Sequence, residues 1–317
     1  MIDDPLHCSN MPRRKKSVDQ KDLPALFANL GHDGCSVCLG GLFKQSRPVA
    51  LVRALMRSGL RNLKLFSSPG SGYDVDLLIA GGVVSETYLP AVTLENRLCP
   101  NFRAAVESGA IKAQAVDALT VVGGLLASAN GVPFQPVTAW AGSDILSLNP
   151  LIERIESPFG SERVYAVRAI SPDIVLLHAQ EGDEYGNVRN LSKMTYADSL
   201  MARAGKKVVI SVDKLIPRET IIRNSTETTI ANIYVEAIVE IPFGAHPTAS
   251  YPFYSMDNEF IEAFADLSDE ARRIGNDAAL REHLSHHVYG PFDSFEYLDT
   301  VGGYRRMSQL EREARFL

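Results

Sequence analysis

The sequence lacks a long apolar run. Its longest weakly polar stretch, residues 118–134, is broken by glycine and asparagine and falls short of the roughly 20 apolar residues that span a bilayer. The N-terminus carries acidic residues and then a basic run at 13–16, with no apolar segment behind it, so it does not have the layout of a secretory signal. We therefore expect a cytoplasmic protein with no membrane partner.

Cysteine is also scarce, and basic residues are outnumbered by acidic ones. Four cysteines in 317 residues are too few for a disulfide framework and fit a reducing compartment. Cys35 and Cys38 have the spacing of a metal or redox pair, but their segment is apolar and no second Cys/His pair follows at zinc spacing. We expect both to be buried and no metal to bind. The net charge of −6 argues against nucleic acid as the main partner.

The motifs of several enzyme classes are missing as well. The chain has no Gly-Lys-Ser/Thr phosphate loop and no dinucleotide fingerprint, which argues against nucleoside triphosphate chemistry. It has neither a Gly-x-Ser-x-Gly elbow nor a His-Glu-x-x-His helix, which argues against common hydrolases and metalloproteases. His286 and His287 stand in a helical C-terminal region and are expected at the surface.

The chain does contain the composition and pattern of an α/β protein. Hydrophobic residues make up 45% and charged residues 22%, close to the globular average. From Cys35 onward short apolar runs alternate with helical stretches, which is typical of a mostly parallel sheet covered by helices. The pattern predicts strands at residues 35–39, 63–66, 164–170, 174–180, 207–212 and 234–241, and helices at 48–56 and 74–80.

The same pattern divides the chain into three predicted parts. Residues 1–31 are polar and basic and are expected to form a disordered or loosely attached arm, and residues 32–256 form the α/β domain. Residues 257–317 are expected to be a helical extension packed on that domain, with Phe260, Ile261 and Phe264 on one helix face. Glycine and proline between 142 and 160 mark either a subdomain boundary or, as we favour, long loops within one domain.

Candidate binding residues follow the first two predicted strands, because ligands sit beyond the carboxyl ends of strands in such sheets. Gly40 and Gly41 follow the first strand, and Ser68, Ser71 and Gly72 follow the second. Glycine lets the backbone approach a ligand and the next helix N-terminus favours anions. Tight turns also need glycine, so a purely structural role stays open. The aspartate at 74 is expected to cap its helix.

Two later loops carry polar residues that a buried strand would not need. His178 and Gln180 end an apolar strand and require hydrogen-bond partners; for His178, a satisfied core histidine is the simpler interpretation. His246 precedes a proline, which restricts its backbone and suits either a site or a rigid turn.

These loops, taken in order, resemble the A-type subunits of glutaconate-type (family I) CoA-transferases. The likeness covers residues 35–306 and rests on Leu39-Gly40-Gly41 with Arg47-Pro48, Asp74-x-Asp76-Leu77-Leu78-Ile79, His178-Ala179-Gln180, and Phe243-Gly244-Ala245-His246-Pro247. The resemblance implies the CoA-transferase-like α/β fold. It also implies a heteromeric enzyme, a heterodimer or a dimer of heterodimers with a B-type subunit.

The resemblance further implies the chemistry. The B-type subunit supplies a glutamate that attacks an acyl-CoA and passes through a glutamyl-CoA intermediate, so this chain supplies no catalytic residue, and Glu95 has a structural role. CoA thioester is a substrate, and no cofactor is bound permanently. Backbone amides of the glycine loops and the Ser68 and Ser71 hydroxyls would bind the carboxylate or its oxyanion, with Gln180 and His246 in the same cleft.

Departures from the family pattern leave alternatives. Tyr73 stands where small residues are usual, so we expect a reshaped pocket and a different acid. A second possibility is the A-type chain of a ring-opening hydrolase of steroid CoA thioesters, with Asp117 as its acid. A third, a ligand-sensing or sugar-phosphate isomerase-like domain, is less favoured because the chain shows no helix-turn-helix.

Overall fold

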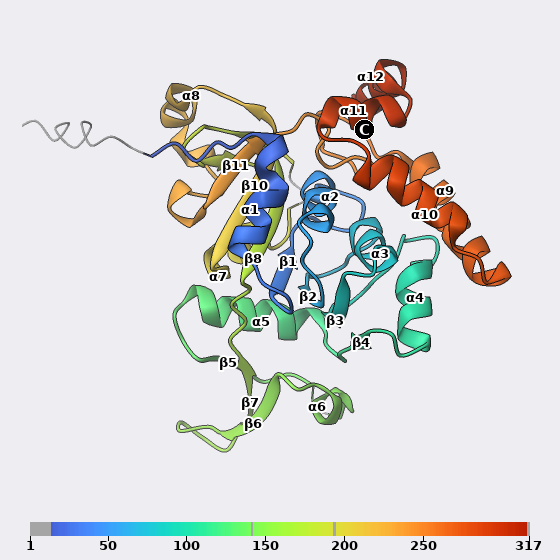
Figure 1. The fold of residues 1–317 in the computed structure, drawn as a ribbon. Coiled ribbons are helices and arrows are strands. Elements are labelled where there is room, and N and C mark those ends of the chain that lie inside the picture. Colours follow the sequence, from blue (N-terminus) through green and yellow to red (C-terminus); the bar gives the residue numbers. More distant parts are fainter. Residues whose placement is uncertain (1–13, 141, 193–194, 316–317) are drawn as a thin grey trace, which may run out of the picture.

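The computed structural model describes residues 14–140, 142–192 and 195–315. Its centre is a twisted sheet whose main path is parallel throughout (Figure 1). In spatial order its strands are β11 (Ala237–Glu240), β10 (Lys207–Leu215), β8 (Ile174–Gly182), β1 (Ser36–Leu39), β2 (Leu63–Phe66), β3 (Val84–Tyr88) and β4 (Lys112–Ala113). A short strand, β9 (Val188–Arg189), pairs antiparallel with the end of β8. The predicted α/β fold with a mostly parallel sheet is confirmed.

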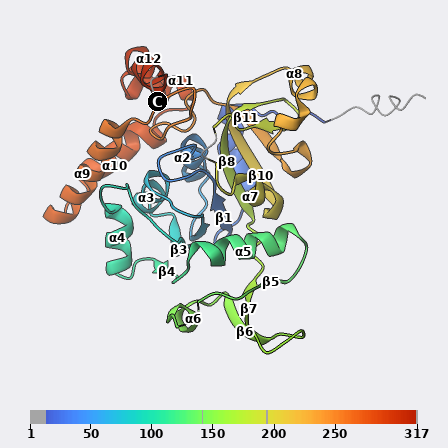
Figure 2. The ribbon, with the colours of Figure 1, turned by 180° about the vertical axis from the view of Figure 1, so that it is seen from behind.

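Helices cover both faces of this sheet. The α-helices are α1 (Leu23–Leu30), α2 (Val49–Arg57), α3 (Tyr73–Ala80), α4 (Pro100–Glu107), α5 (Ala118–Ala129), α6 (Ile145–Leu148), α7 (Asp198–Ala204), α8 (Arg218–Arg223), α9 (Asn258–Ile274), α10 (Ala278–Leu284), α11 (Ser294–Thr300) and α12 (Gly303–Ala314). Four of them (α1, α2, α3 and α9) pack on one face, and α5 and α7 lie on the other, which Figure 2 shows from behind. No helix of the described residues is long and apolar enough to cross a membrane.

The central strands are apolar on both faces because each face is covered. In β1, Val37 and Leu39 belong to the core under α2, whereas Cys38 belongs to the core under α5 and α7, as the alternation of side chains along a strand requires. Cys35 and Cys38 are both buried, as expected. They lie in different cores, so their sulfur atoms do not converge on a shared site.

A second, smaller sheet occupies the middle of the sequence. It is antiparallel, with β7 (Arg163–Arg168) between β5 (Phe134–Val137) and β6 (Ile152–Glu156), and it projects below α5 in Figure 1. The favoured interpretation of residues 142–160 as long loops was therefore wrong. The predicted strand at 164–170 exists, but it belongs to this small sheet and not to the parallel one. Glycine and proline were interpreted as loop residues, although part of them form the hairpin turn between β6 and β7.

The N-terminal segment is more ordered than we expected. Within the described residues, Ser17 forms a parallel bridge with Ile238 of β11. Leu23 and Phe27 of α1 are buried in the main core. The expectation of a loosely attached arm was wrong for residues 14–31, because two apolar side chains one helical turn apart suffice to dock a short helix. Residues 1–13 lie outside the described part of the chain, and the division at 32 and 257 stays a prediction.

Candidate active-site edge of the parallel sheet

The carboxyl edge of the parallel sheet concentrates unusual backbone geometry. Phe43, Ser46, Glu95 and Phe243 all have positive φ angles, between 49° and 69°, and lie in the loops that follow β1, β3 and β11. Side chains with a Cβ rarely adopt this conformation, and it persists where the surroundings impose it, often at functional sites. This edge is the candidate active site.

A buried arginine ties the first two loops together. Arg47 has no exposed surface, and its Nε and Nη2 donate to Asp74 Oδ2 at 2.8 and 2.5 Å. Its Nη1 donates to the Gly41 carbonyl at 3.1 Å. Asp74 therefore neutralises Arg47 and does not cap α3, whose N-cap residue is Gly72. Such a pair is costly to bury but far costlier to break.

The two glycines after β1 need to be glycine, and their amides are already used. A Cβ on Gly40 would lie 2.3 Å from a methyl group of Leu177, and Gly41 has φ of +83°. The Gly40 N–H donates to the Leu176 carbonyl at 2.9 Å, and the Gly41 N–H donates to Asp198 Oδ1 at 2.9 Å. In this conformation neither N–H is available to an oxyanion, so binding by these amides stays a prediction that the backbone hydrogen bonds do not support.

Asp198, at the start of α7, is a functional candidate that the sequence analysis missed. It is buried, its Oδ1 holds the glycine loop, and its Oδ2 has no hydrogen-bond partner among the described residues. Burial raises the pKa of this carboxyl. Its residue type and position resemble an ordinary helix start, so no signal in the sequence marked it.

The second loop separates its two serines. Ser71 is buried with its hydroxyl 3.5 Å from Arg47 Nη2, which donates to it. Ser68 is equally buried, but its Oγ has no hydrogen-bond partner among the described residues. Buried hydroxyl groups are normally paired, so an unpaired one points to a missing ligand or water. Gly72, also buried, packs against the Thr93 carbonyl, which leaves no room for a Cβ.

Gln180 belongs to a buried polar chain that crosses from β8 to the loop after β11. Its Nε2 donates to Ser250 Oγ at 2.9 Å, and Ser250 Oγ donates to Asp213 Oδ2 at 2.5 Å. The Gln180 Oε1 accepts from the Leu191 N–H at 2.9 Å. Asp213 keeps one buried oxygen, Oδ1, without a partner among the described residues.

His178 joins the same chain, with Nε2 at 3.1 Å from Asp213 Oδ2 and Nδ1 at 2.9 Å from Ser211 Oγ. Both ring nitrogens are satisfied, so the simpler interpretation of a core histidine is confirmed.

His246 has a different environment. Its Nδ1 lies 2.8 Å from Tyr297 Oη and its Nε2 lies 3.2 Å from Asp257 Oδ2. The other oxygen of that carboxylate, Oδ1, lies 2.7 Å from Arg306 Nη2 of α12. Burial lowers the pKa of His246. These contacts anchor the C-terminal helices on the sheet. No hydrogen bond of the described residues joins His246 to Gln180, so the structure does not bring the two into one cluster.

Two residues expected to shape the chemistry have structural positions. The Tyr73 ring is buried against Phe264 of α9, with ring centres 5.1 Å apart, so it does not reshape a substrate pocket as we expected. Asp117 caps α5 by accepting from the Thr120 N–H at 2.7 Å, and its other oxygen accepts from Trp140 Nε1.

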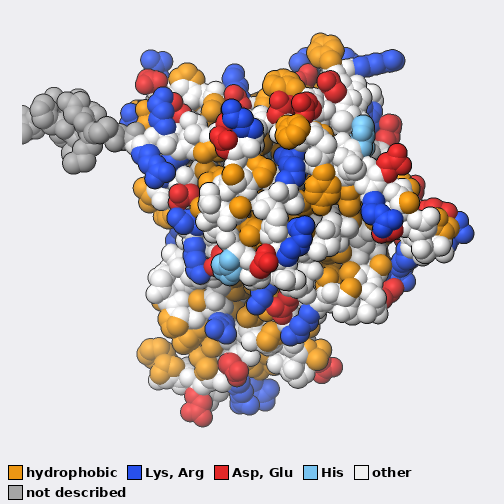
Figure 3. Space-filling model, in the orientation of Figure 1, with side chains coloured by type: hydrophobic (Ala, Val, Ile, Leu, Met, Phe, Trp, Pro, Cys, Tyr) orange, Lys and Arg blue, Asp and Glu red, His pale blue; other side chains and the backbone are white. Residues whose placement is uncertain are grey.

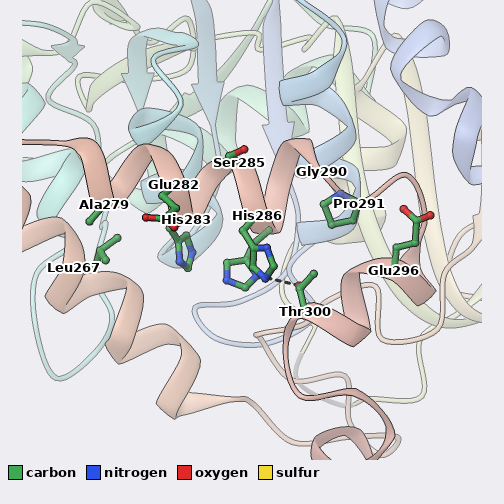
Figure 4. Close-up of a pocket in the computed structure, with 11 residues that line it drawn as sticks. Leu267, Ala279, Glu282, His283, Ser285, His286, Gly290, Pro291, Glu296 and Thr300 are labelled. Atoms are coloured by element: carbon green, nitrogen blue, oxygen red, sulfur yellow. Dashed lines mark hydrogen bonds between the residues drawn. The ribbon is translucent and has the colours of Figure 1, made fainter.

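A hollow on the C-terminal helices is a competing candidate. Figure 4 shows it between α9, α10 and α11, with His283 and His286 in its wall. His287 lines it as well, and its ring centre is 4.6 Å from that of His286. Ring centres of His283 and His287 are 4.4 Å apart, and His287 Nδ1 lies 3.0 Å from Thr300 Oγ1. His286 is exposed as expected, but His287 is half-buried, so the expectation of a surface pair was only half right.

Electrostatics do not favour this hollow as a catalytic or metal site. Burial lowers the pKa of His283 to about 4 and that of His287 to about 3, so both are neutral at pH 7. In the described ranges of the chain, no group of three or more histidine, cysteine or acidic side chains has the geometry to hold a metal ion.

The comparisons with known proteins agree with the fold. Residues 25–241 match the family model of coenzyme A transferase. The A chain of glutaconate CoA-transferase from Acidaminococcus fermentans is 28% identical over 92% of this chain and 93% of its own. The solved structure of glutaconate coenzyme A-transferase from that organism superposes with a TM-score of 0.84 and 26% identity, covering 93% of this chain and 95% of that one.

Other relatives are named for different substrates or reactions. The cholesterol ring-cleaving hydrolase IpdA subunit of Mycobacterium tuberculosis is 30% identical over 87% of this chain and 94% of its own. The A chain of a 3-oxoadipate CoA-transferase from Pseudomonas knackmussii is 31% identical over 75% of this chain and 84% of its own. A further relative, an uncharacterized protein of Archaeoglobus fulgidus, is 28% identical, and this chain spans 62% of its length.

Proposed function

Because the chain belongs to the coenzyme A transferase family, we propose that it is the A-type subunit of an enzyme that moves CoA from an acyl-CoA to a carboxylic acid. The observation that carries this proposal is the match to the A chain of glutaconate CoA-transferase, which extends over nearly the whole length of both chains in sequence and in fold. We propose a cytoplasmic assembly with a B-type subunit, in one or two pairs.

The proposed reaction divides one difficult exchange into easier covalent steps. A glutamate carboxylate, supplied by the B-type subunit, attacks the thioester carbonyl, and CoA leaves as the thiolate, which gives a mixed anhydride. The thiolate then attacks the glutamyl carbonyl, so the first acid is released and a glutamyl-CoA thioester remains. The second carboxylate takes CoA by the same two steps in reverse. CoA thioester is a substrate throughout, and no further cofactor is required.

This chain's part would be to bind and orient the acyl group. Ser68 is the best-supported contact, because its buried hydroxyl is unpaired within the described residues and lies directly after β2. Asp198 would keep the Gly40–Gly41 turn in place through the Gly41 N–H. The Gln180 side-chain amide is held at both ends, since its Nε2 donates to Ser250 and its Oε1 accepts from the Leu191 N–H. His246 would act from a distance by holding the C-terminal helices.

Two of the expected site residues receive less support. Ser71 and Gly72 are packed against Arg47 and the Thr93 carbonyl, respectively, so we propose that they shape the loop and do not contact the acid. The ring-cleaving hydrolase remains a second candidate, because its IpdA subunit is 30% identical. Against it, Asp117 is occupied as a helix cap and as the acceptor of Trp140.

The test is to purify the chain alone and with its B-type partner and to supply an acyl-CoA with a second acid. We expect no turnover by the chain alone, and with the partner we expect exchange of CoA between the acids and a partner subunit heavier by covalently bound CoA. Exchange by the chain alone would refute the two-subunit proposal. Ring opening by the complex without CoA exchange would establish the hydrolase instead.

A further inference from the structure

We propose that the small sheet β5-β7-β6 joins two copies of this chain, through antiparallel pairing of their β6 strands around a two-fold axis. The inference concerns which surface of this chain joins the two copies, and it does not depend on the reaction proposed above.

The β6 strand has a free edge. It pairs with β7 on one side, and within the described residues no strand pairs with its other side. The Arg168 N–H donates to the Leu151 carbonyl at 2.9 Å, so residue 151 faces β7. Because these groups alternate in direction along a strand, 153 and 155 face β7 as well, and 152, 154 and 156 turn their N–H and C=O groups outwards. Of these groups, the Ile152 N–H already donates to the Asn149 carbonyl at 3.4 Å. The outward set limits the registers in which a second copy could pair.

Symmetric registers with the two-fold axis at any residue from 152 to 156 satisfy this limit, and charge distinguishes them. An axis at Glu153, Arg154 or Glu156 places that charged side chain opposite its own copy, and like charges directly opposite destabilise a sheet. An axis at Ile152 brings no two charged side chains of the strand opposite each other. An axis at Ile155 places Arg154 opposite Glu156 twice and brings the two Ile155 side chains together. The strand is therefore self-complementary in one register, which is what a two-fold interface requires.

The charges on this strand have no partner among the described residues of their own chain. Glu153, Arg154 and Glu156 are exposed, and no salt bridge or side-chain hydrogen bond formed by the described residues includes them. By contrast, Arg189, on the strand that flanks β8, is paired with both Glu181 and Glu227. Unpaired charges of alternating sign on an open edge fit a second strand with the complementary pattern.

One face of the small sheet is also open and apolar. Its other face packs on α5, where Val167 lies against Gly123. The open face has a hollow lined by Phe134, Ile155 and other apolar side chains, with Phe159 at the hairpin tip 97% exposed. Figure 3 shows hydrophobic side chains beside separate acidic and basic ones at this lower end of the molecule.

The Ile155 register extends that apolar face into a second copy. Residues 157–159 of one copy then come opposite residues 151–153 of the other. The Phe159 hairpin tip thereby approaches the end of α6, where Leu148 is 64% exposed. Two exposed apolar side chains at opposite ends of one strand are brought together only by an antiparallel partner.

Charge reversal tests the register. The full chain, alone and with its B-type partner, is measured by sedimentation for mass and self-association constant. We expect wild type to contain two copies of this chain, and Arg154→Glu and Glu156→Arg each to weaken self-association at least about tenfold, since the axis counts each pair twice. The double variant Arg154→Glu/Glu156→Arg restores the opposite-charge pairs and should return the constant to near the wild-type value.

A disulfide tests the position of the axis. Opposed residues that do not exchange backbone hydrogen bonds have Cα atoms about 4.5 Å apart, which a disulfide can bridge. In a Cys8→Ser background, where Cys35, Cys38 and Cys99 are buried, Ile155→Cys should cross-link on mild oxidation, whereas Tyr304→Cys on exposed α12 should not. A single copy in wild type, no rescue by the double reversal, or equal cross-linking at 155 and 304 would each overturn the proposal.

Discussion

Two buried carboxylates at the same edge of the sheet are in opposite situations. Asp74 accepts two hydrogen bonds from Arg47, and that arginine also reaches the Gly41 carbonyl and Ser71. Asp198 accepts one N–H from the other side of the same turn and keeps a buried oxygen unpaired within the described residues. The difference separates groups that hold the fold from groups that remain available to a ligand, although the sequence presents them as equivalent aspartates.

The largest expected effect comes from breaking the satisfied pair. Arg47→Met should lower the free energy of unfolding by about 3–5 kcal/mol, because Asp74 is left buried without its partner. Urea unfolding measures it. Arg47→Met/Asp74→Leu should recover most of the loss, and Arg273→Met, at an exposed arginine, should stay within about 0.5 kcal/mol. An Arg47→Met protein as stable as wild type would contradict a stabilising role for the pair.

Ser68 and Ser71 allow the same comparison to be made by measuring kcat. Ser68→Ala should lower kcat of the assembled enzyme by about 100-fold, the usual effect of losing one donor to a developing oxyanion. Its unfolding free energy should stay within about 0.5 kcal/mol, because the hydroxyl has no partner among the described residues. Ser71→Ala, the matched control, should keep kcat within about twofold. Equal kinetics for the two variants would remove Ser68 from the substrate site.

The pH dependence of stability in Asp198→Asn should show the effect of burying a carboxyl group that has no cationic partner among the described residues. Burial raises the pKa of the Asp198 carboxyl in the folded protein, so the stability linked to its protonated form is present below the unfolded pKa and lost as pH rises through the folded pKa. Asparagine keeps the acceptor for the Gly41 N–H and cannot ionise. The unfolding free energy of the variant minus that of wild type should therefore increase from pH 4 to pH 8. Parallel stability curves would show that the carboxyl remains ionised.

The smallest expected effect concerns the histidine hollow. There burial lowers the pKa of the histidines, whereas it raises the pKa of Asp198. The pKa of His283 falls to about 4 and that of His287 to about 3, below the unfolded value of about 6.5. Stability is then present above pH 6.5 and lost as pH falls through the folded values. His283→Phe should reduce the fall in Tm between pH 6.5 and 4 by about 2 °C. His32→Phe, outside the hollow, should not alter it.

Much of the fold follows from local pattern. The strands β1, β2, β8 and β10, and the helices α2, α3 and α9, stand within a few residues of their predicted positions. The buried face of α9 contains Ile261 and Phe264 as expected. Apolar periodicity is a property of neighbours in sequence, so it survives without knowledge of the tertiary structure. The small sheet was missed because β5 and β6 are separated by residues 138–151 and become strands only by pairing with β7.

The site residues divide along the same line. The sequence by itself determined which loops lie at the carboxyl edge of the sheet, since glycine, serine and histidine directly after apolar strands mark that edge of a parallel sheet. Only the tertiary structure decided what each residue does there: Ser71 contacts Arg47, Ser68 contacts no partner in the described chain, and Gly41 binds Asp198, 157 residues away. Hydrogen-bond partners of buried polar groups are set by long-range packing, and one chain carries no local record of them.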